Sequence, residues 1–180
     1  HDCGRTWDAH GPVHSDRSPT EHGFVSTIQE GEGHWLFWLD GRNMKPGAHG
    51  HGAGSMTLRG AFATPSVITD DVELDSMVCE CCNTDAALAT NGPIVVYRDL
   101  DASHLRDIAI TRRVDRQWTT PVRIHADDWE INGCPVNGPA IDARDDTVVV
   151  AWYTAPNGEP SVNVMFSNDA GATFGALCVV

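Results

Sequence analysis

The sequence predicts an all-β protein made of repeated antiparallel units, and three observations support this prediction. Aromatic side chains recur at intervals of 55, 56 and 56 residues, at Trp7, Phe62, Trp118 and Phe174. Short runs of β-branched and aromatic residues lie between them, bounded by Gly, Pro, Asn and Asp, which is typical of strands and turns. No long stretch has the spacing of an amphipathic helix. A fixed period of this size indicates an array in which each repeat is one supersecondary unit.

A turn motif precedes the last of these aromatic residues. Residues 167–174 read Ser-x-Asp-x-Gly-x-Thr-Phe, and residues 2–7 carry the same pattern without its serine, Asp-x-Gly-x-Thr-Trp. In a tight hairpin turn, Gly supplies backbone freedom, and Asp and Ser or Thr hydrogen-bond neighbouring amides. We expect each aromatic ring to pack beneath its turn. Decayed copies of the motif end at Phe62 and Trp118.

Each repeat contains the same order of expected strands. The innermost are short and rich in small residues, and we place them at residues 23–29, 84–89 and 138–143. Second strands are expected at residues 35–39, 94–97 and 148–153, and third strands at residues 55–59, 107–112 and 162–167. Fourth strands follow the turns, as at residues 121–124.

Four antiparallel strands in a repeat of about 55 residues form a blade of a β-propeller. We therefore predict that residues 1–180 form part of a β-propeller with about three four-stranded blades and with repeat boundaries near residues 7, 62, 118 and 174. An all-β sandwich would not explain the regular period. The chain shows no initiator Met and no signal peptide, so we expect it to be a piece of a longer protein.

Charge and cysteine content limit the partners and the compartment. The 25 acidic and 12 basic residues give a net charge of −13, which argues against nucleic acid and anionic membranes as partners. No apolar run approaches the roughly 20 residues of a membrane span. Six cysteines without zinc-finger spacing favour an oxidising compartment. We expect a periplasmic or extracellular protein.

The turn motif resembles the Asp box, also called the BNR repeat, of the sialidase superfamily. The resemblance rests on the copies at residues 2–7 and 167–174 and on the period. It implies a ring of six blades, of which about half is present, with the missing blades supplied by the full-length chain. It also implies an exported glycoside hydrolase of the exo-α-sialidase type or a glycan-binding protein. Because the motif also occurs in sorting receptors and non-catalytic propellers, the function has to be argued from a site.

Strand direction gathers the unusual residues on the face opposite the turns. The loops that leave the second strands and the loops that enter the first strands converge there, near the axis. The exits from the second strands carry Asp40, Arg42, Arg98, Asp99 and Tyr153. The entries to the first strands carry Glu21, His22, Cys79, Cys81, Cys82, Cys134 and Asn137.

Two arginines occupy equivalent positions in neighbouring repeats. Arg42 and Arg98 follow second strands, with Asp40 and Asp99 beside them, and a guanidinium fork suits a substrate carboxylate. We expect both arginines to face one axial pocket, with these four residues as candidate catalytic groups. The candidate substrate-binding residues are Glu21, His22, Asn137 and Tyr153. Alternatively, the arginines only pair with neighbouring aspartates and hold the loops together.

The sialidases that the chain resembles hold a sugar acid with an arginine cluster and add an aspartate acid and a Tyr–Glu nucleophile pair. The resemblance places that pair in blades outside this chain. A propeller of another class remains the alternative, in which a Cys/His cluster binds a metal or staples the blades.

The cysteines allow two interpretations. One is a disulfide between adjacent blade entries, for example from Cys82 to Cys134. The other is a thiolate site for copper or zinc, since soft sulfur and nitrogen ligands favour these metals. Its candidate ligands are Cys79, Cys81, Cys82 and Cys134, with His22, His49 or His51 as nitrogen donors. The glycine-rich residues 41–54 form a lid, a metal-binding arm or a flexible loop tip. Cys3 and Cys178 are expected to be structural thiols or disulfide partners.

Overall fold

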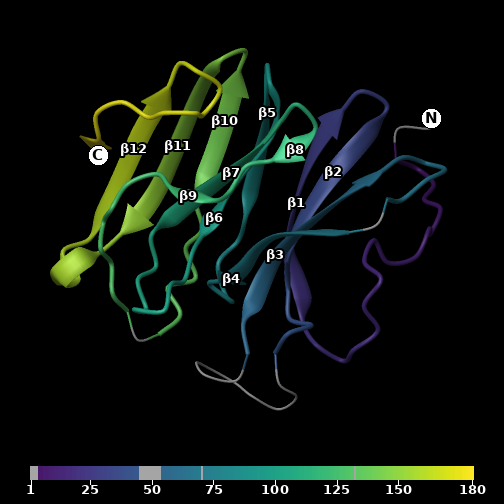
Figure 1. Cartoon of the computed structure of the whole chain (residues 1–180), viewed down its shortest axis with the longest axis horizontal. Coiled ribbons are helices and arrows are strands. Elements are labelled where there is room, and N and C mark those ends of the chain that lie inside the picture. Colours follow the sequence, from purple (N-terminus) through teal and green to yellow (C-terminus); the bar gives the residue numbers. More distant parts are fainter. Residues whose placement is uncertain (1–3, 45–53, 70, 132) are drawn as a thin grey trace.

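The computed structural model describes residues 4–44, 54–69, 71–131 and 133–180 of the chain. These residues form an all-β protein with three antiparallel sheets, as predicted (Figure 1). The helical structure in this part of the chain is one 3₁₀ turn, Pro156–Gly158. In the same ranges, no helix has the length and apolarity that crossing a membrane would require.

Each sheet is built from strands that follow one another along the chain. The first sheet has the order β1 (His22–Glu30), β2 (Gly33–Asp40), β3 (Met56–Ala63) and β4 (Val72–Val78). The second contains β5 (Asp85–Ala89), β6 (Gly92–Arg98), β7 (Ile108–Val114), β8 (Gln117–Trp118) and β9 (Val122–Arg123). The third has the order β10 (Ala140–Arg144), β11 (Thr147–Thr154), β12 (Ser161–Ser167) and β13 (Cys178–Val179).

The expected first, second and third strands of all three repeats are confirmed, and most extend slightly beyond the predicted ends. One boundary differs. The third strand of the first sheet continues through Phe62, which pairs with Trp35 of β2 instead of closing a turn. The chain turns later, where the amide of Thr64 donates to the carbonyl of Val67 at 2.7 Å. The Thr64 hydroxyl also accepts from the Val67 amide, so this turn is closed by a side chain that the motif does not contain.

The core lies on both faces of the middle sheet, because alternate residues of a strand point to opposite faces. In β6, Val95 and Tyr97 join the apolar cluster of the first sheet, whereas Ile94 and Val96 join that of the third sheet. In β7, Ala109 packs towards the first sheet. All of these side chains are at most 1% exposed. The continuous apolar run of the predicted second strand is therefore explained by burial on both sides.

Three of the four periodic aromatic rings pack against this core. Trp118 meets Trp35 edge to face at a centroid distance of 5.4 Å, Phe62 also packs against the first cluster, and Phe174 packs against the second. Trp7 differs, since it is 87% exposed and its indole N–H donates to the carbonyl of Gly4. The expectation that its ring packs beneath a turn is wrong, and Asp2 and Cys3 lie outside the described residues.

The turn at residues 167–174 has the hydrogen bonds that its sequence predicts. The hydroxyl of Ser167 accepts from the amide of Gly171 at 2.9 Å. The carboxylate of Asp169 accepts from the Thr173 amide at 2.8 Å and from the Thr173 hydroxyl at 2.6 Å. Gly171 has a φ of 77°, which an L side chain adopts only with strain. The turn connects β12 to β13, the third and fourth strands, as expected.

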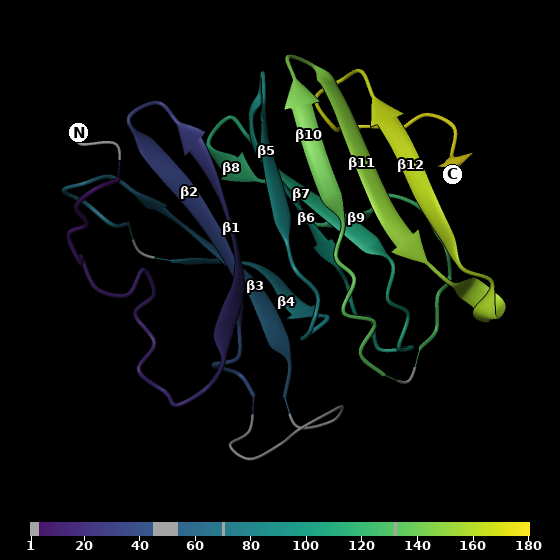
Figure 2. The same ribbon diagram turned by 180° about the vertical axis from the view of Figure 1, so that it is seen from behind.

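The first strands of the three sheets lie together. Strand β5 contacts both β1 and β10, and it lies between them when the molecule is seen from behind (Figure 2). The connections that enter these strands are therefore brought close to one another. This arrangement positions the cysteine cluster described next.

Candidate functional site

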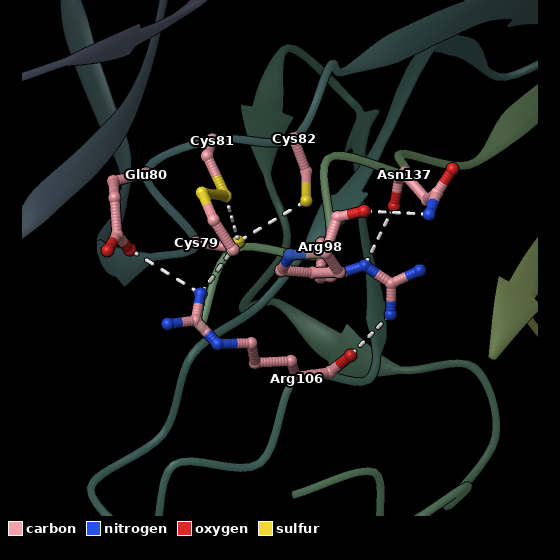
Figure 3. The surroundings of a disulfide bond; sticks show 9 residues. Cys79, Glu80, Cys81, Cys82, Arg98, Arg106 and Asn137 are labelled. Carbon is pink, nitrogen blue, oxygen red and sulfur yellow. Dashed lines mark hydrogen bonds and ion pairs between the residues drawn. A yellow bond between two sulfur atoms is a disulfide. The ribbon is translucent and has the colours of Figure 1, made fainter. Parts of the chain in front are cut away.

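The cysteines expected at the sheet entries meet where the first sheet passes into the second (Figure 3). Cys81 and Cys82 lie in the turn between β4 and β5, and Cys134 lies between β9 and β10. The disulfide joins Cys81 to Cys134, with the Cα atoms 6.1 Å apart. The predicted pairing of Cys82 with Cys134 is therefore wrong. Cys82 is 1% exposed and faces the interior of the turn, whereas Cys81 is only half-buried and faces the neighbouring connection.

Two thiols remain beside the disulfide, and both are buried. The Sγ atom of Cys79 lies 3.3 Å from that of Cys82 and 3.7 Å from that of Cys81. The guanidinium of Arg106 donates to the Cys79 sulfur at 2.8 Å. The carboxylate of Glu80 lies 3.4 Å from the same guanidinium. The cluster thus combines two thiols, a disulfide and a buried positive charge.

The environment makes the two thiols different. Contact with the Cys82 thiol, together with the positive charge of Arg106, holds the pKa of Cys79 below its ordinary value. The same contact, together with burial, raises the pKa of Cys82. Cys79 is therefore the more acidic thiol of the pair, and the guanidinium of Arg106 favours its thiolate form. A thiolate is the form of cysteine that attacks disulfides and binds metals.

The four-sulfur metal site is not available in this state, because Cys81 and Cys134 are joined to each other. The side chain that neutralises Cys79 is Arg106, which occupies one side of the sulfur. Of the proposed nitrogen ligands, His49 and His51 lie outside the described residues. His22 is engaged in the first sheet, where its ring stacks on His14 with centroids 4.0 Å apart.

Arg98 is buried and bonded to the protein, and it does not face an open pocket. Its side chain is 1% exposed and donates to the carbonyls of Asn137 at 2.8 Å and Tyr153 at 2.7 Å. A third donor reaches the carbonyl of Arg106, and the guanidinium lies 4.9 Å from the centre of the Trp129 ring. Burial lowers the pKa of Arg98. This arginine fixes three chain segments against one another, which is different from the expected substrate-facing role.

Arg42 belongs to a separate cluster on the first sheet. Its guanidinium contacts Asp40 at 2.7 Å and Asp71 at 3.2 Å, and Arg59 contacts the same Asp71 at 2.8 Å. Although burial raises the pKa of Asp40, hydrogen bonds from Arg42 and Trp38 lower it to about 2. Among the described residues, no hydrogen bond or ion pair joins Arg42 to Arg98. For Arg42, the alternative interpretation is therefore correct: it pairs with neighbouring aspartates and holds loops together.

His22 lies beside this cluster. Its Nε2 atom is 3.0 Å from a carboxylate oxygen of Asp16 and 3.5 Å from one of Asp40. These three side chains could offer ligand atoms to a cation. However, Arg42 already supplies the positive charge at Asp40. Glu21 contributes through its backbone, whose carbonyl accepts from the amide of Gly41 at 2.8 Å, and the residue itself is exposed.

Asp99 pairs with Val78 in an antiparallel bridge, next to Cys79. Its amide donates to the carbonyl of Asp107 at 2.9 Å, and its carboxylate accepts from the amide of Leu100 at 2.8 Å. Burial raises the pKa of Asp99 to about 6, and the nearby charge of Asp75 acts in the same direction. Burial thus brings the titration of Asp99 nearer to neutral pH than that of Asp40.

Tyr153 borders a crevice beside Arg98. The crevice encloses about 630 Å³, and the side chains that line it include Asp128, Trp129, Glu130, Tyr153 and Asn157. The rings of Trp129 and Tyr153 meet edge to face at a centroid distance of 5.7 Å. Asn137 does not line it, and its side-chain amide donates to the carbonyl of Pro135. The backbone carbonyl of Asn137 accepts a hydrogen bond from Arg98, so Asn137 is connected to the crevice through that buried side chain.

Two residues of the site were missed by sequence reasoning. Arg106 precedes a third strand and Trp129 lies in a long connection, so neither stands at a predicted entry or exit. The signal that could have found Arg106 is the charged pair Arg106 and Asp107 directly before the apolar run of residues 108–110. In comparisons with known proteins, no family model matches the chain and no curated protein matches it.

Proposed function

We propose that the chain forms part of a β-propeller similar to those of the sialidase superfamily. The side-by-side first strands β1, β5 and β10 support this proposal, since the first strand of each blade lines the axis of a propeller. The packing of the middle sheet between its two neighbours also supports it. The hydrogen bonds of residues 167–174 are those expected of an Asp box. The propeller would be completed by further blades of the full-length chain.

Within this propeller, we propose that the chain binds a carbohydrate and does not supply the hydrolytic groups. The crevice beside Tyr153 is the observation that carries the proposal. Its volume lies in the range of ligand pockets, roughly 300–1,000 Å³. Aromatic rings suit the apolar faces of sugars, and the carboxylates and amides around them can accept or donate hydrogen bonds to hydroxyl groups. Arg98 holds the Tyr153 and Trp129 segments in place from inside.

The charges at the crevice favour a neutral or cationic sugar over a sugar acid. Asp128 and Glu130 line it, and Arg98 gives its donors to backbone carbonyls below it. A ligand carboxylate would meet negative charge without a free arginine fork, which is unfavourable. The chain's net charge of −13 acts in the same direction. This ligand class differs from the sugar acid that the family resemblance implies.

Binding of defined oligosaccharides to the full-length protein tests this proposal. Neutral glycans should bind more tightly than sialylated ones, and Tyr153→Ala should weaken binding about tenfold, corresponding to about 1.4 kcal/mol. Arg144→Ala, at an exposed position of β10, is the matched control and should bind normally. Selective binding of sialosides, or binding that is unchanged in Tyr153→Ala, would rule out this crevice as the site.

The disulfide supports a second proposal, that the protein is exported and that its blade entries are stapled. Cys81 and Cys134 are 53 residues apart, and closing a loop of this length stabilises a folded chain by about 4 kcal/mol in the chain-entropy account. Such bonds persist in the periplasm and outside the cell. Thiol counting on protein purified from its native compartment, with thiols blocked at lysis, measures this directly. Protein in which Cys79, Cys81, Cys82 and Cys134 are all reduced would contradict it.

A further inference from the structure

The four cysteines of the cluster form a continuous series of sulfur contacts. The Cys82 sulfur touches that of Cys79 at 3.3 Å, and Cys79 touches that of Cys81 at 3.7 Å. Cys81 is bonded to Cys134. Exchange between thiols and disulfides requires a thiolate in contact with a disulfide sulfur, and this series contains such a contact without any movement of the backbone.

The two ends of the series differ in their exposure to solvent. Cys79 and Cys82 are buried at its inner end, whereas Cys134 is exposed at its outer end. Arg106 donates to the Cys79 sulfur through Nη1, and the carboxylate of Glu80 approaches the same nitrogen (Figure 3). A buried arginine beside a sulfur favours the thiolate at that position. The thiolate therefore lies inside the protein, in contact with the inner sulfur of a disulfide whose outer cysteine reaches solvent.

We propose that these residues form an internal thiol–disulfide relay, in which the disulfide passes from Cys81–Cys134 to the buried pair and frees Cys134 at the surface. In the first step the Cys79 thiolate attacks the Cys81 sulfur. A bond forms between Cys79 and Cys81, the bond between Cys81 and Cys134 breaks, and Cys134 leaves as a thiolate that takes a proton from water.

In the second step the Cys82 sulfur attacks the Cys79 sulfur and loses its proton. The bond between Cys79 and Cys82 forms, and Cys81 leaves with the bonding electron pair and takes up a proton. One disulfide and two thiols are present before and after the relay, so no external oxidant or reductant is consumed. The product has lost the staple between the two connections and exposes a thiol that can exchange with an external thiol or disulfide. The relay is independent of carbohydrate binding.

Arg106 is a positioning residue in this scheme, because it acts on the sulfur of Cys79 and exchanges no bond itself. Its presence also distinguishes a relay from a disulfide that only crosslinks the two connections. A staple needs only Cys81 and Cys134, whereas a relay needs an inner thiolate with a partner charge.

The test traps freed Cys134 in the folded, full-length protein. N-ethylmaleimide is added without reductant, and peptide mass spectrometry follows labelling of Cys134 over time. We expect Cys134 to be labelled while the peptide containing residues 79–82 acquires an internal disulfide. Cys79→Ser should abolish this labelling. Cys178→Ser, at an exposed thiol of β13, should leave it unchanged and exclude exchange between molecules through Cys178.

A second measurement does not depend on the folding of the Cys79 variant. In the wild-type protein, the rate of Cys134 labelling should rise with pH as Cys79 ionises and then level off. Arg106→Gln should move this rise to higher pH. Below the plateau the thiolate fraction should fall roughly tenfold for each unit by which the pKa rises, and the labelling rate roughly threefold, because a more basic thiolate is also more nucleophilic. Folded wild-type protein that labels Cys178 but never Cys134 would overturn the relay. A labelling profile that Arg106→Gln leaves unmoved would overturn the role of Arg106.

Discussion

At the scale of single residues, the arginines show how burial determines what a charged side chain can do. Arg98 and Arg42 were expected to hold a ligand carboxylate together. Arg98 instead bonds three backbone carbonyls, and Arg42 bonds two aspartates. A guanidinium has five donors in a fixed fork, so a buried arginine with most of them engaged has little capacity left for a ligand. Both side chains contribute to stability, and Arg98 also positions the wall of the crevice at Tyr153.

Replacing Arg98 should therefore destabilise the fold. Arg98→Ala leaves the carbonyls of Asn137, Arg106 and Tyr153 without their donors and removes a buried side chain. We expect the free energy of unfolding to fall by about 3 kcal/mol or more, as measured by urea denaturation. Arg144→Ala, which is exposed, is the control and should change it by less than about 0.5 kcal/mol. Equal stability of the two variants would contradict the buried role of Arg98.

Asp99 should make stability depend on pH. Burial raises its pKa in the folded protein to about 6, above the value of about 3.9 in unfolded chains. The folded state therefore binds more protons at Asp99, so the associated stabilisation is complete below about pH 4 and is lost as the pH rises through 6.

Urea denaturation between pH 4 and pH 7 measures this effect against Asp99→Asn, which cannot ionise. We expect the wild-type protein to lose about 2–3 kcal/mol relative to the variant over this range. Asp142→Asn, at an exposed position of β10, should run parallel to the wild type. Parallel curves for the wild type and Asp99→Asn would contradict the raised pKa.

At the scale of elements, the strands could be predicted because their signal is local. Alternate side chains of β6 point to opposite faces of the sheet, and both faces are buried. A strand of this kind appears in the sequence as a short apolar run, and such runs located the second strand of every repeat. The choice between Cys81 and Cys82 depended on the direction of side chains within one turn, which sequence spacing does not determine. Arg106 reaches Cys79 across 27 positions of the chain, and such a contact becomes visible only when the sheets are packed.

The turn between β12 and β13 should depend on Ser167 more than on its neighbours. Its buried hydroxyl accepts from the amides of Asp169 at 3.2 Å and Gly171 at 2.9 Å. Ser167→Ala leaves these amides unsatisfied and should lower the free energy of unfolding by about 1–2 kcal/mol. Asn168→Ala changes an exposed position of the same turn and should have an effect below about 0.5 kcal/mol. A chemical denaturation series distinguishes the two, and equal effects would assign the turn's stability to its backbone alone.

At the scale of the whole molecule, the three sheets bury apolar side chains unequally. The middle sheet is covered on both faces, whereas the outer face of the third sheet carries Val162 and Phe166, which are 41% and 50% exposed. The partners of these residues on β11 are Tyr153 and Val149, so the apolar side chains lie opposite one another across the strands. A contiguous apolar face of this kind is typical of a surface that packs against another element.

If the propeller proposal is correct, a further sheet of the full-length protein covers this face. Phe166 should then be protected in the full-length protein, because its ring would lie between two sheets as the ring of Phe37 does here. Hydroxyl-radical footprinting of the full-length protein, with each rate divided by the rate in the unfolded protein, compares Phe166 with Phe37, which is 0% exposed. We expect the protection of Phe166 to approach that of Phe37. Oxidation of Phe166 at a rate fitting a half-exposed ring would mean that no sheet packs here, and the radial arrangement would then end at the third sheet.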